Sequence, residues 1–246
     1  MTREPEIEKN KPLVTVLTLC YNHEPFLHDY MRGILMQKTN FRFKVIIGDD
    51  ASTDKTASII REYAEKYPDI FEPIYFEENQ YSKGCSIIKK YFIPKLREKP
   101  TKYIALCEGD DFWTYPHKLQ KQVDFLETHP EYSACYHHYT TVYESGIEGE
   151  QTQFNLRHSR RLSVYDILIE PQFQLATTVM RSDVLLNDKE LYEYLGTTLF
   201  SDLALFLSSY HSGKVFCFKE WWSAYRIHSG GISNKDSQQA AKDRHI

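Results

Sequence analysis

The chain lacks four features that would each point to a function class at once. No apolar run approaches the length of a membrane span, and the first eleven residues are polar and charged, so no signal peptide is expected. The five cysteines lie far apart without a Cys-x-x-Cys pair, which disfavours a zinc knuckle and favours buried thiols in a reducing cytoplasm. A net charge of −4 argues against nucleic acid as the main partner.

What the chain does have is enough apolar material for a sizeable core. It contains 246 residues, of which 41% are hydrophobic and 14% aromatic. It shows no internal repeat, no low-complexity tract and no clear linker. We therefore expect a single domain over residues 1–246.

Apolar runs and helical spacing alternate over the first 130 residues. Such alternation implies an α/β fold with a mostly parallel sheet and helices on both faces. The expected strands are residues 14–19, 43–47, 71–76 and 103–107. The expected helices are residues 25–37, 52–67 and 85–97, the last with Pro94 as a kink or stop, and one that opens at Pro116 with the apolar face Leu119, Val123 and Leu126.

The second half is less regular. Its expected strands are residues 133–142, 173–180, 215–218 and 221–227, and its expected helices are residues 183–195 and 202–210. The polar stretch 144–161 predicts a loop. It carries a basic cluster, Arg157, His158, Arg160 and Arg161, which predicts a solvated face, with contact to a diphosphate or an anionic membrane as the alternatives.

The most informative stretch is Glu108-Gly109-Asp110-Asp111. It directly follows the apolar run 103–107, so its acids are expected at the carboxyl end of a buried strand, where open α/β sheets bind ligands. Like charges this close need a compensating cation or several donors. Mg²⁺ or Mn²⁺ shared with a phosphate would fit, and a solvated acidic turn is the simpler alternative.

Three further segments contain candidate functional residues: Asp49 with Asp50, Asp202, and His228. Asp49 and Asp50 end a strand, where they could bond a nucleoside or simply cap the following helix. Asp202 is expected at a helix start, either as a stabilising first-turn acid or as a general base. His228 precedes Gly230 and Gly231; it is either solvated or a metal ligand that would favour Mn²⁺ over Mg²⁺.

Together these segments resemble glycosyltransferase family 2, inverting enzymes of the GT-A fold, over residues 12–233. The opening strand through Cys20-Tyr21-Asn22 resembles the family's first nucleotide-contacting strand. Asp49-Asp50-Ala51-Ser52-Thr53-Asp54 resembles Asp-Asp-Gly-Ser-x-Asp, and Glu108-Gly109-Asp110-Asp111 stands where the Asp-x-Asp metal motif stands. Ser201-Asp202-Leu203 resembles the Glu-Asp segment of the catalytic base, and Tyr225-Arg226-Ile227-His228 resembles Tyr-Arg-x-His.

The resemblance implies a Rossmann-like nucleotide-sugar-binding half at about residues 12–130 and an acceptor and catalytic-base half at about residues 131–233. It implies metal-dependent, inverting hexosyl transfer from a UDP-sugar to a glycan or lipid-linked acceptor, in polysaccharide or glycoconjugate synthesis. The protein would be cytoplasmic, with peripheral contact at the inner face of the membrane.

The resemblance also implies residue roles. Asp202 would be the catalytic base, and Asp110, Asp111 and His228 would hold Mg²⁺ or Mn²⁺. The donor would be bound by Thr18, Tyr21, Asn22, Asp49, Asp50, Glu108 and Asp110. Residues 172–178, Trp221 and Trp222 would line the acceptor side.

Two other functions stay open at this point. A nucleotidyltransferase would also set a metal-bound nucleotide on an α/β sheet, but its glycine-rich, arginine-containing phosphate loop has no counterpart in residues 19–23. A non-catalytic nucleotide-sugar-binding module is compatible with Ala51 and Glu108, which depart from the family pattern. The retained Asp110 and Asp202 argue against it.

Overall fold

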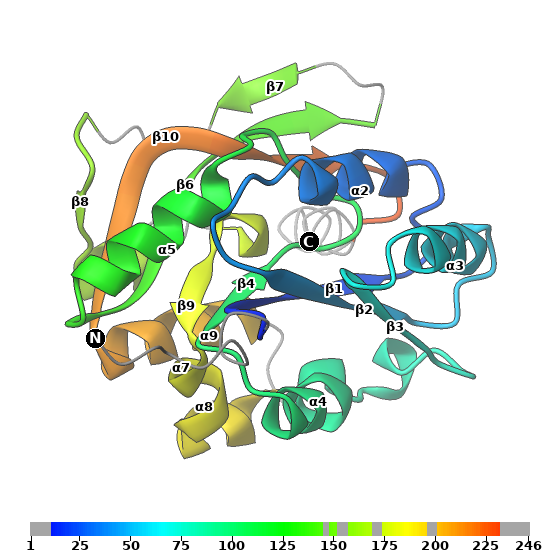
Figure 1. Ribbon diagram of the computed structural model, residues 1–246, viewed down its shortest axis with the longest axis horizontal. Coiled ribbons are helices and arrows are strands. Elements are labelled where there is room, and N and C mark those ends of the chain that lie inside the picture. Colours follow the sequence, from blue (N-terminus) through cyan, green and yellow to red (C-terminus); the bar gives the residue numbers. More distant parts are fainter. Residues whose placement is uncertain (1–10, 145–147, 152–156, 169–173, 196–200, 232–246) are drawn as a thin grey trace, which may run out of the picture.

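The computed structural model describes residues 11–144, 148–151, 157–168, 174–195 and 201–231 (Figure 1). Its centre is a ten-stranded sheet in which eight strands follow the order β3-β2-β1-β4-β9-β6-β10-β5, while β7 pairs with β6 and β8 with β10. The strands are β1 Val14–Cys20, β2 Phe43–Asp49, β3 Phe71–Tyr75, β4 Tyr103–Leu106, β5 Phe112–Trp113, β6 Tyr132–Tyr143, β7 Glu148–Gln151, β8 Arg160–Arg161, β9 Val179–Arg181 and β10 Lys214–Ile227.

Helices flank this sheet. They are α2 Leu27–Leu35, α3 Thr56–Lys66, α4 Ile93–Glu98, α5 Lys118–Thr128, α6 Val164–Leu168, α7 Ser182–Asn187, α8 Lys189–Tyr194 and α9 Ser201–Ser212. Short turns of 3-10 helix lie at η1 Tyr81–Lys83 and η3 Leu175–Thr177, and a π-helical turn, η2, lies at Ile88–Phe92.

The sheet is parallel in its first half and mixed in its second. Strands β3, β2, β1 and β4 all run parallel, with Val14 of β1 between Phe43 and Tyr103. Beyond β4, strand β9 is antiparallel to both β4 and β6, β10 runs parallel to β6, and β5 is antiparallel to β10. The expected mixed α/β class with a mostly parallel nucleus is confirmed.

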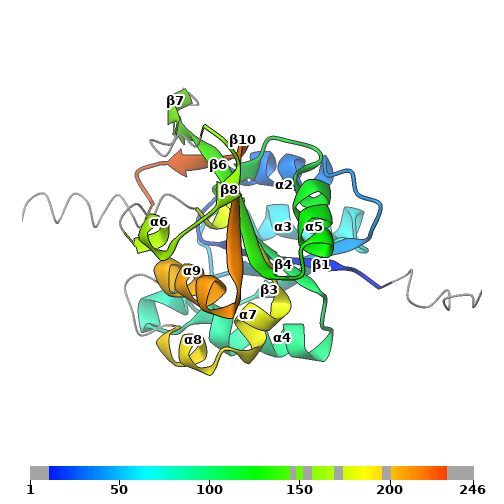
Figure 2. The ribbon, with the colours of Figure 1, turned by 90° about the vertical axis from the view of Figure 1, so that its left-hand side faces the viewer.

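Alternation along the buried strands divides the core between the two faces of the sheet. Val14 and Val16 of β1 belong to a cluster with α2, α3 and α5, whereas Leu17 belongs to a cluster with α4, α7, α8 and α9. Figures 1 and 2 show these two helix layers above and below the sheet. Period-two alternation in a strand thus supplies both layers with apolar side chains.

The expected helices of the first half are confirmed, with one difference at Pro94. Helix α5 buries Leu119, Val123 and Leu126, as its spacing predicts. Pro94 neither stops nor ends its helix. It lies in the first turn of α4, directly after the π-helical turn, where the missing N–H of proline is tolerated.

The polar stretch 144–161 was expected to be a loop, and this is wrong for residues 148–151 and 160–161, which form strands. Strand β7 pairs antiparallel with β6, and Arg160 and Arg161 pair with Cys217 and Phe216 of β10. Backbone groups can extend a sheet edge whatever the polarity of the side chains, so composition does not reveal such strands.

Three further expectations change in the second half. Residues 174–178 are not a strand, because Thr177 bonds back to the Gln174 carbonyl and forms a 3-10 turn before β9; Phe173 lies outside the described residues. The expected helix 183–195 is two helices, because Asp188 caps α8 by accepting a 2.9 Å hydrogen bond from the Leu191 N–H. The two expected strands at 215–218 and 221–227 are one strand, β10, irregular between Cys217 and Ser223.

Candidate functional site

The candidate site lies at the sheet edge where β1, β2 and β4 end. The three loops that follow these strands are tied together by backbone hydrogen bonds. The Asp50 N–H donates to the Cys20 carbonyl at 2.9 Å, and the Gly109 N–H donates to the Leu19 carbonyl at 3.1 Å. This is the edge at which the sequence predicts ligand binding.

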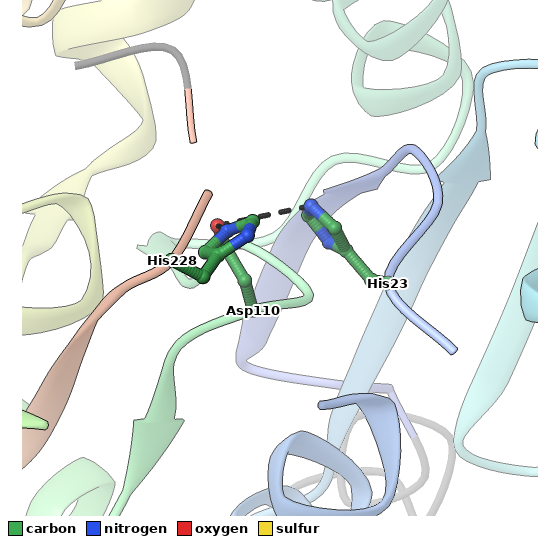
Figure 3. A group of neighbouring side chains, drawn as sticks. All are labelled: His23, Asp110 and His228. Atoms are coloured by element: carbon green, nitrogen blue, oxygen red, sulfur yellow. Dashed lines mark hydrogen bonds and ion pairs between the residues drawn. The ribbon is translucent and has the colours of Figure 1, made fainter. Parts of the chain in front are cut away.

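Asp110 is the centre of the cluster in Figure 3. Its Oδ2 lies 3.0 Å from Nε2 of His228 and 3.7 Å from Nε2 of His23. Its Oδ1 is buried and has no hydrogen-bond partner among the described residues. A buried carboxylate oxygen without a donor is costly, so this oxygen is suited to a bound cation.

The two histidines come from distant parts of the chain. His23 follows β1, and its backbone N–H donates to Thr56 Oγ1 at 2.8 Å, which ties its loop to the start of α3. His228 follows β10 and packs 4.6 Å from the ring of Phe26, with its ring at 88° to that of His23. The tertiary fold, not the local sequence, therefore places both imidazoles beside Asp110.

Gly109 allows the loop of Asp110 to approach the end of β1. A Cβ at this position would lie 2.3 Å from Cys20 Sγ and 3.0 Å from His23 Nδ1. The first contact is too short for any Cβ, so the loop or the Cys20 side chain would have to move, and the second is tighter than ordinary van der Waals contact. The glycine between Glu108 and Asp110 is therefore required for the close contact between the two strand ends.

Arg226 holds the acidic loop from the other side. Its Nε donates to the Asp110 carbonyl at 3.0 Å, its backbone N–H donates to Asp111 Oδ1 at 2.9 Å, and its Nη2 donates to Asp29 Oδ2 at 2.9 Å. The side chain is 6% exposed. Its five donors in a fixed fork make arginine well suited to orienting such a loop.

The carboxylates of this loop differ in their pKa values. Burial, followed by the charge of Asp110, raises the pKa of Glu108 and of Asp111 well above the ordinary range. Burial would also raise the pKa of Asp110, but the hydrogen bond from His228 and the charges of both histidines outweigh it and lower that pKa. The charged carboxylate is therefore best compensated at Asp110.

Asp202 is the second residue of α9 and belongs to the same region. Its negative charge also raises the pKa of Glu108, after burial and the charge of Asp110, so the two carboxylates lie within electrostatic range. The Asp202 side chain is exposed, yet surrounding protein raises the pKa of its carboxyl group. An accessible carboxylate of raised basicity has the properties of a general base.

At the end of β2 the acids are already bonded. Both oxygens of Asp50 accept backbone N–H groups, from Gln80 at 2.6 Å and from Tyr81 at 3.0 Å. Asp49 accepts the Ser52 N–H at 3.3 Å through Oδ2, while its buried Oδ1 has no partner among the described residues. Burial raises the pKa of Asp49. Asp49 therefore retains a free acceptor oxygen, and Asp50 holds a loop in place.

The remaining donor-binding candidates follow β1. Tyr21 is 44% exposed at the strand end. Asn22 accepts the Thr53 N–H at 2.8 Å and so links the loops after β1 and β2. Thr18 does not join them, because it is 1% exposed and its hydroxyl is hydrogen-bonded to Tyr30 in the core.

The two tryptophans expected on the acceptor side, Trp221 and Trp222, differ in their exposure. Trp222 is 5% exposed and its ring stacks on Tyr115, so it packs within the fold. Trp221 is half-buried and lies against His138. Of residues 172–178, the first two lie outside the described residues.

Sequence reasoning missed two site residues, His23 and Arg226. Arg226 lies within a segment that the family resemblance singles out and His23 directly follows one, but neither has a local pattern that assigns it a role. His23 follows the end of β1 at the ligand edge, which is the one signal that could have selected it.

The side chains at this edge could hold a divalent ion in two overlapping ways. Glu108, Asp110 and Asp111 form one set of close ligand atoms, and His23, Asp110 and His228 form another; within each set the atoms lie within 4.8 Å of one another. Asp110 is common to both sets, and its buried Oδ1 has no hydrogen-bond partner among the described residues, so these residues fit a cation.

In the part of the chain that the structure describes, no helix has the length and apolar character needed to cross a membrane.

Comparison with known proteins supplies relatives for this chain. The sequence model of glycosyl transferase family 2 matches residues 15–193, a stretch that includes Asp110 and ends before Asp202. An uncharacterized protein of Mycobacterium tuberculosis is 34% identical over 220 residues, covering 89% of this chain and 60% of that protein. A putative teichuronic acid biosynthesis glycosyltransferase of Bacillus subtilis is 34% identical over 116 residues, covering 47% of this chain and 42% of that protein.

Solved structures share the fold. TarS of S. aureus in complex with UDP-GlcNAc superposes with a TM-score of 0.66 at 18% identity, covering 90% of this chain and 60% of that chain. The mannosyltransferase PcManGT of Pyrobaculum calidifontis, in complex with GDP-Man and Mn²⁺, gives 0.61 at 18% identity, covering 94% and 61%. At such identities the likeness concerns the fold, which is the expected GT-A fold.

The chain spans 60% of the length of the Mycobacterium relatives it matches. The family model nevertheless covers most of the chain, including the strand ends that carry Asp49, Asp50 and Asp110. On this match, the chain belongs to glycosyl transferase family 2.

Proposed function

We propose that this chain is a metal-dependent, inverting hexosyltransferase that transfers a sugar from a UDP-sugar to an acceptor hydroxyl. One observation carries the proposal. Within the described residues the buried Oδ1 of Asp110 has no hydrogen-bond partner, and Glu108 of the same loop lies within electrostatic range of Asp202. Both observations support a cation site and a catalytic base in one region of the protein. The nucleotide sugars bound by TarS and PcManGT support a donor of this class.

In this mechanism the donor lies across the ends of β1, β2 and β4. Tyr21 and Asn22 contact the nucleoside together with Asp49, whose free oxygen can accept from a base N–H or ribose hydroxyl. Asp50 acts by holding the loop at Gln80 and Tyr81. Residues 12–130 thus form the donor-binding half, and residues 131–233 supply the base, within one domain.

Asp110 would hold Mg²⁺ or Mn²⁺, with Asp111, His228 and Glu108 around it. When bound, such an ion neutralises charge on the departing diphosphate. Arg226 keeps the loop oriented through the Asp110 carbonyl and Asp111.

Asp202 removes the proton from the acceptor hydroxyl as its oxygen attacks the anomeric carbon. The new carbon–oxygen bond forms on one face while the bond to the diphosphate oxygen breaks on the other, and the nucleoside diphosphate leaves. The proton ends on the Asp202 carboxylate. One displacement inverts the carbon, so an α-linked donor gives a β-linked product.

The test is Asp202→Asn. It should lower transfer by roughly a hundredfold or more while UDP binding survives, because only the proton acceptor is lost. Asp183→Asn is a matched control, since Asp183 is also the exposed second residue of a helix that begins with serine. Near-normal turnover of Asp202→Asn would remove this base. A wild-type chain that binds donors tightly but never hydrolyses or transfers them would instead be a binding module.

We further propose peripheral contact with an anionic membrane at the inner face, where a lipid-linked glycan acceptor would lie. Helix α6 buries Asp166 and Ile167 and leaves three apolar side chains exposed, and the segment that precedes it in the sequence carries exposed basic residues. This α6 patch consists of Val164, Tyr165, Leu168, Arg157, His158 and Arg161. Apolar and basic groups together suit the surface of anionic lipids. The five free cysteines support a reducing, cytoplasmic location.

Sedimentation with vesicles tests this contact. The protein should bind vesicles containing an anionic lipid and not neutral ones, and Tyr165→Ser combined with Arg161→Glu should reduce binding several-fold while leaving the fold intact. Equal binding by this double variant, or binding to neutral vesicles alone, would contradict the proposal.

A further inference from the structure

Asp110 belongs to two possible ligand sets of different chemistry. The first, with Glu108 and Asp111, offers only carboxylate oxygens. The second, with His23 and His228, offers two imidazole nitrogens and one carboxylate. Hard Mg²⁺ prefers oxygens and retains several waters, whereas imidazole suits ions of the Mn²⁺ to Zn²⁺ series. The two sets therefore predict different ions.

The distances in the second set match those of ligand atoms around one ion. With bonds of about 2.1 Å, neighbouring ligand atoms lie about 3.0 Å apart in an octahedral site and about 3.4 Å apart in a tetrahedral one. Nε2 of His228 and of His23 lie 3.0 and 3.7 Å from Asp110 Oδ2. Both rings turn an Nε2 edge to the same carboxylate, as Figure 3 shows.

The first set is less available. Asp111 is 1% exposed, and its Oδ1 already accepts the backbone N–H of Arg226 at 2.9 Å. By contrast, Asp110 Oδ1 and His23 Nδ1 are buried and unpartnered among the described residues. Unsatisfied polar atoms therefore collect around the histidine set, on the side where Gly109 leaves no room for a Cβ.

We propose that His23, Asp110 and His228 form a two-histidine, one-carboxylate site that selects a transition-series ion, with Mn²⁺ as the first candidate, over Mg²⁺. His23 is the new ligand, supplied by the loop after β1. The inference deepens the proposed function by naming the ion class of the donor site. It relies on that function only for what the ion does, not for its binding.

The direct test measures ion binding to the chelator-treated full chain without nucleotide. Calorimetry should give a dissociation constant for Mn²⁺ roughly tenfold or more below that for Mg²⁺. Pulsed electron paramagnetic resonance of bound Mn²⁺ should detect two imidazole nitrogens. Equal affinity for the two ions, or coupling to fewer than two nitrogens, would overturn the proposal.

Substitutions show which of the two ligand sets binds the ion. His23→Gln should weaken Mn²⁺ binding by roughly tenfold or more and remove one nitrogen coupling. His28→Gln, at an exposed histidine of α2, is the control and should bind Mn²⁺ as the wild type does. A large loss in Glu108→Gln with none in His23→Gln would assign the ion to the carboxylate set instead. If His23→Gln does not fold, the wild-type nitrogen couplings alone decide.

Failure of this inference and failure of the proposed function give different results. If transfer runs equally well with Mg²⁺ and His23→Gln is unaffected, the histidine site is wrong and the transferase stands. If Mn²⁺ binds with both nitrogens but no nucleotide sugar binds or reacts, the site stands and the transferase is wrong.

Discussion

The ends of β2 and β4 carry the same kind of residue at the same edge of the sheet, yet the structure uses them differently. At β2, Asp50 accepts two backbone N–H groups through its two oxygens. At β4, Asp110 contacts two imidazoles through Oδ2, and its buried Oδ1 has no hydrogen-bond partner in the described part of the chain. The first carboxylate is satisfied by the protein itself, and the second is not.

This difference shows that the position of a carboxylate at a strand end does not determine what it does. The role of the carboxylate depends on the groups that contact it, and these groups come from distant parts of the chain. Asp50 is faced by the backbone at Gln80 and Tyr81, and Asp110 by His23 and His228. Four substitutions test this contrast.

The largest expected effect is that of Asp110→Asn. It should lower metal-dependent UDP affinity by roughly a hundredfold, because the ion loses the carboxylate shared by both ligand sets. The melting temperature should change little, because the amide oxygen of asparagine can still accept the hydrogen bond from His228 and Oδ1 has no partner among the described residues to lose. Calorimetry with and without Mn²⁺ measures the affinity. Unchanged metal-dependent affinity would remove Asp110 from the ion site.

Asp50→Asn should show the opposite pattern. Its carboxylate accepts two N–H groups, and the amide NH₂ cannot accept, so the free energy of unfolding should fall by about 3 kcal/mol. UDP affinity of the folded fraction should be nearly normal. Denaturant unfolding measures the stability. A large loss of affinity at unchanged stability would instead show direct contact between Asp50 and the nucleoside.

Much of the first half of the molecule is predictable from sequence, because its signals are local. Buried runs such as residues 103–107 are flanked on both faces by helices, so strand and layer both follow from the pattern. In the second half, β10 could not be predicted as one strand, because Lys219 and Glu220 interrupt its apolar pattern, while pairing with β6 on both sides of them makes the strand continuous. Long-range pairing decides such boundaries.

The same distinction applies to the site. Glu108, Asp110, Asp202 and His228 could be selected from motifs that lie within a few residues. His23 and Arg226 could not, because their roles exist only once β10 lies beside the loops after β1 and β4. The hydroxyl of Thr18 shows the converse, since only the fold reveals that it bonds to Tyr30 in the core.

Burial is the largest cause of the raised pKa values of Glu108 and Asp111, which follow β4. Lys118 provides a separate test of the effect of burial, because no carboxylate is among the causes of its pKa shift. Lys118 on α5 is fully buried, its Nζ lies 4.2 Å from the centre of the Trp113 ring, and burial lowers its pKa to about 7. Between pH 7 and its unfolded value the unfolded chain binds more protons, so this group adds stability as the pH rises.

Raising the pH from 7 to 9 should therefore increase the stability of the wild type relative to Lys118→Met by about 2 kcal/mol. Lys121→Met, at an exposed lysine of the same helix, should show no such dependence. Denaturant unfolding at several pH values measures the difference. A constant difference between the wild type and Lys118→Met would mean that burial does not shift this lysine.

The smallest expected effect concerns the turn after β2. Ala51 has a φ of 56°, a left-handed conformation that disfavours side chains with a Cβ, and the family pattern has glycine here. Ala51→Gly should raise the free energy of unfolding by about 1 kcal/mol or less, because the relief of strain is partly offset by the entropy of the unfolded glycine. Thermal unfolding checks the sign. A clear loss of stability would mean that the turn is not strained.

Anomalous diffraction from crystals grown with UDP and Mn²⁺ tests the whole account most directly. We predict one manganese peak within bonding distance of Asp110, between His23 and His228, with the diphosphate on it and the sugar side facing Asp202. A nucleotide bound elsewhere, or an ion that leaves Asp110 uncontacted, would contradict the account.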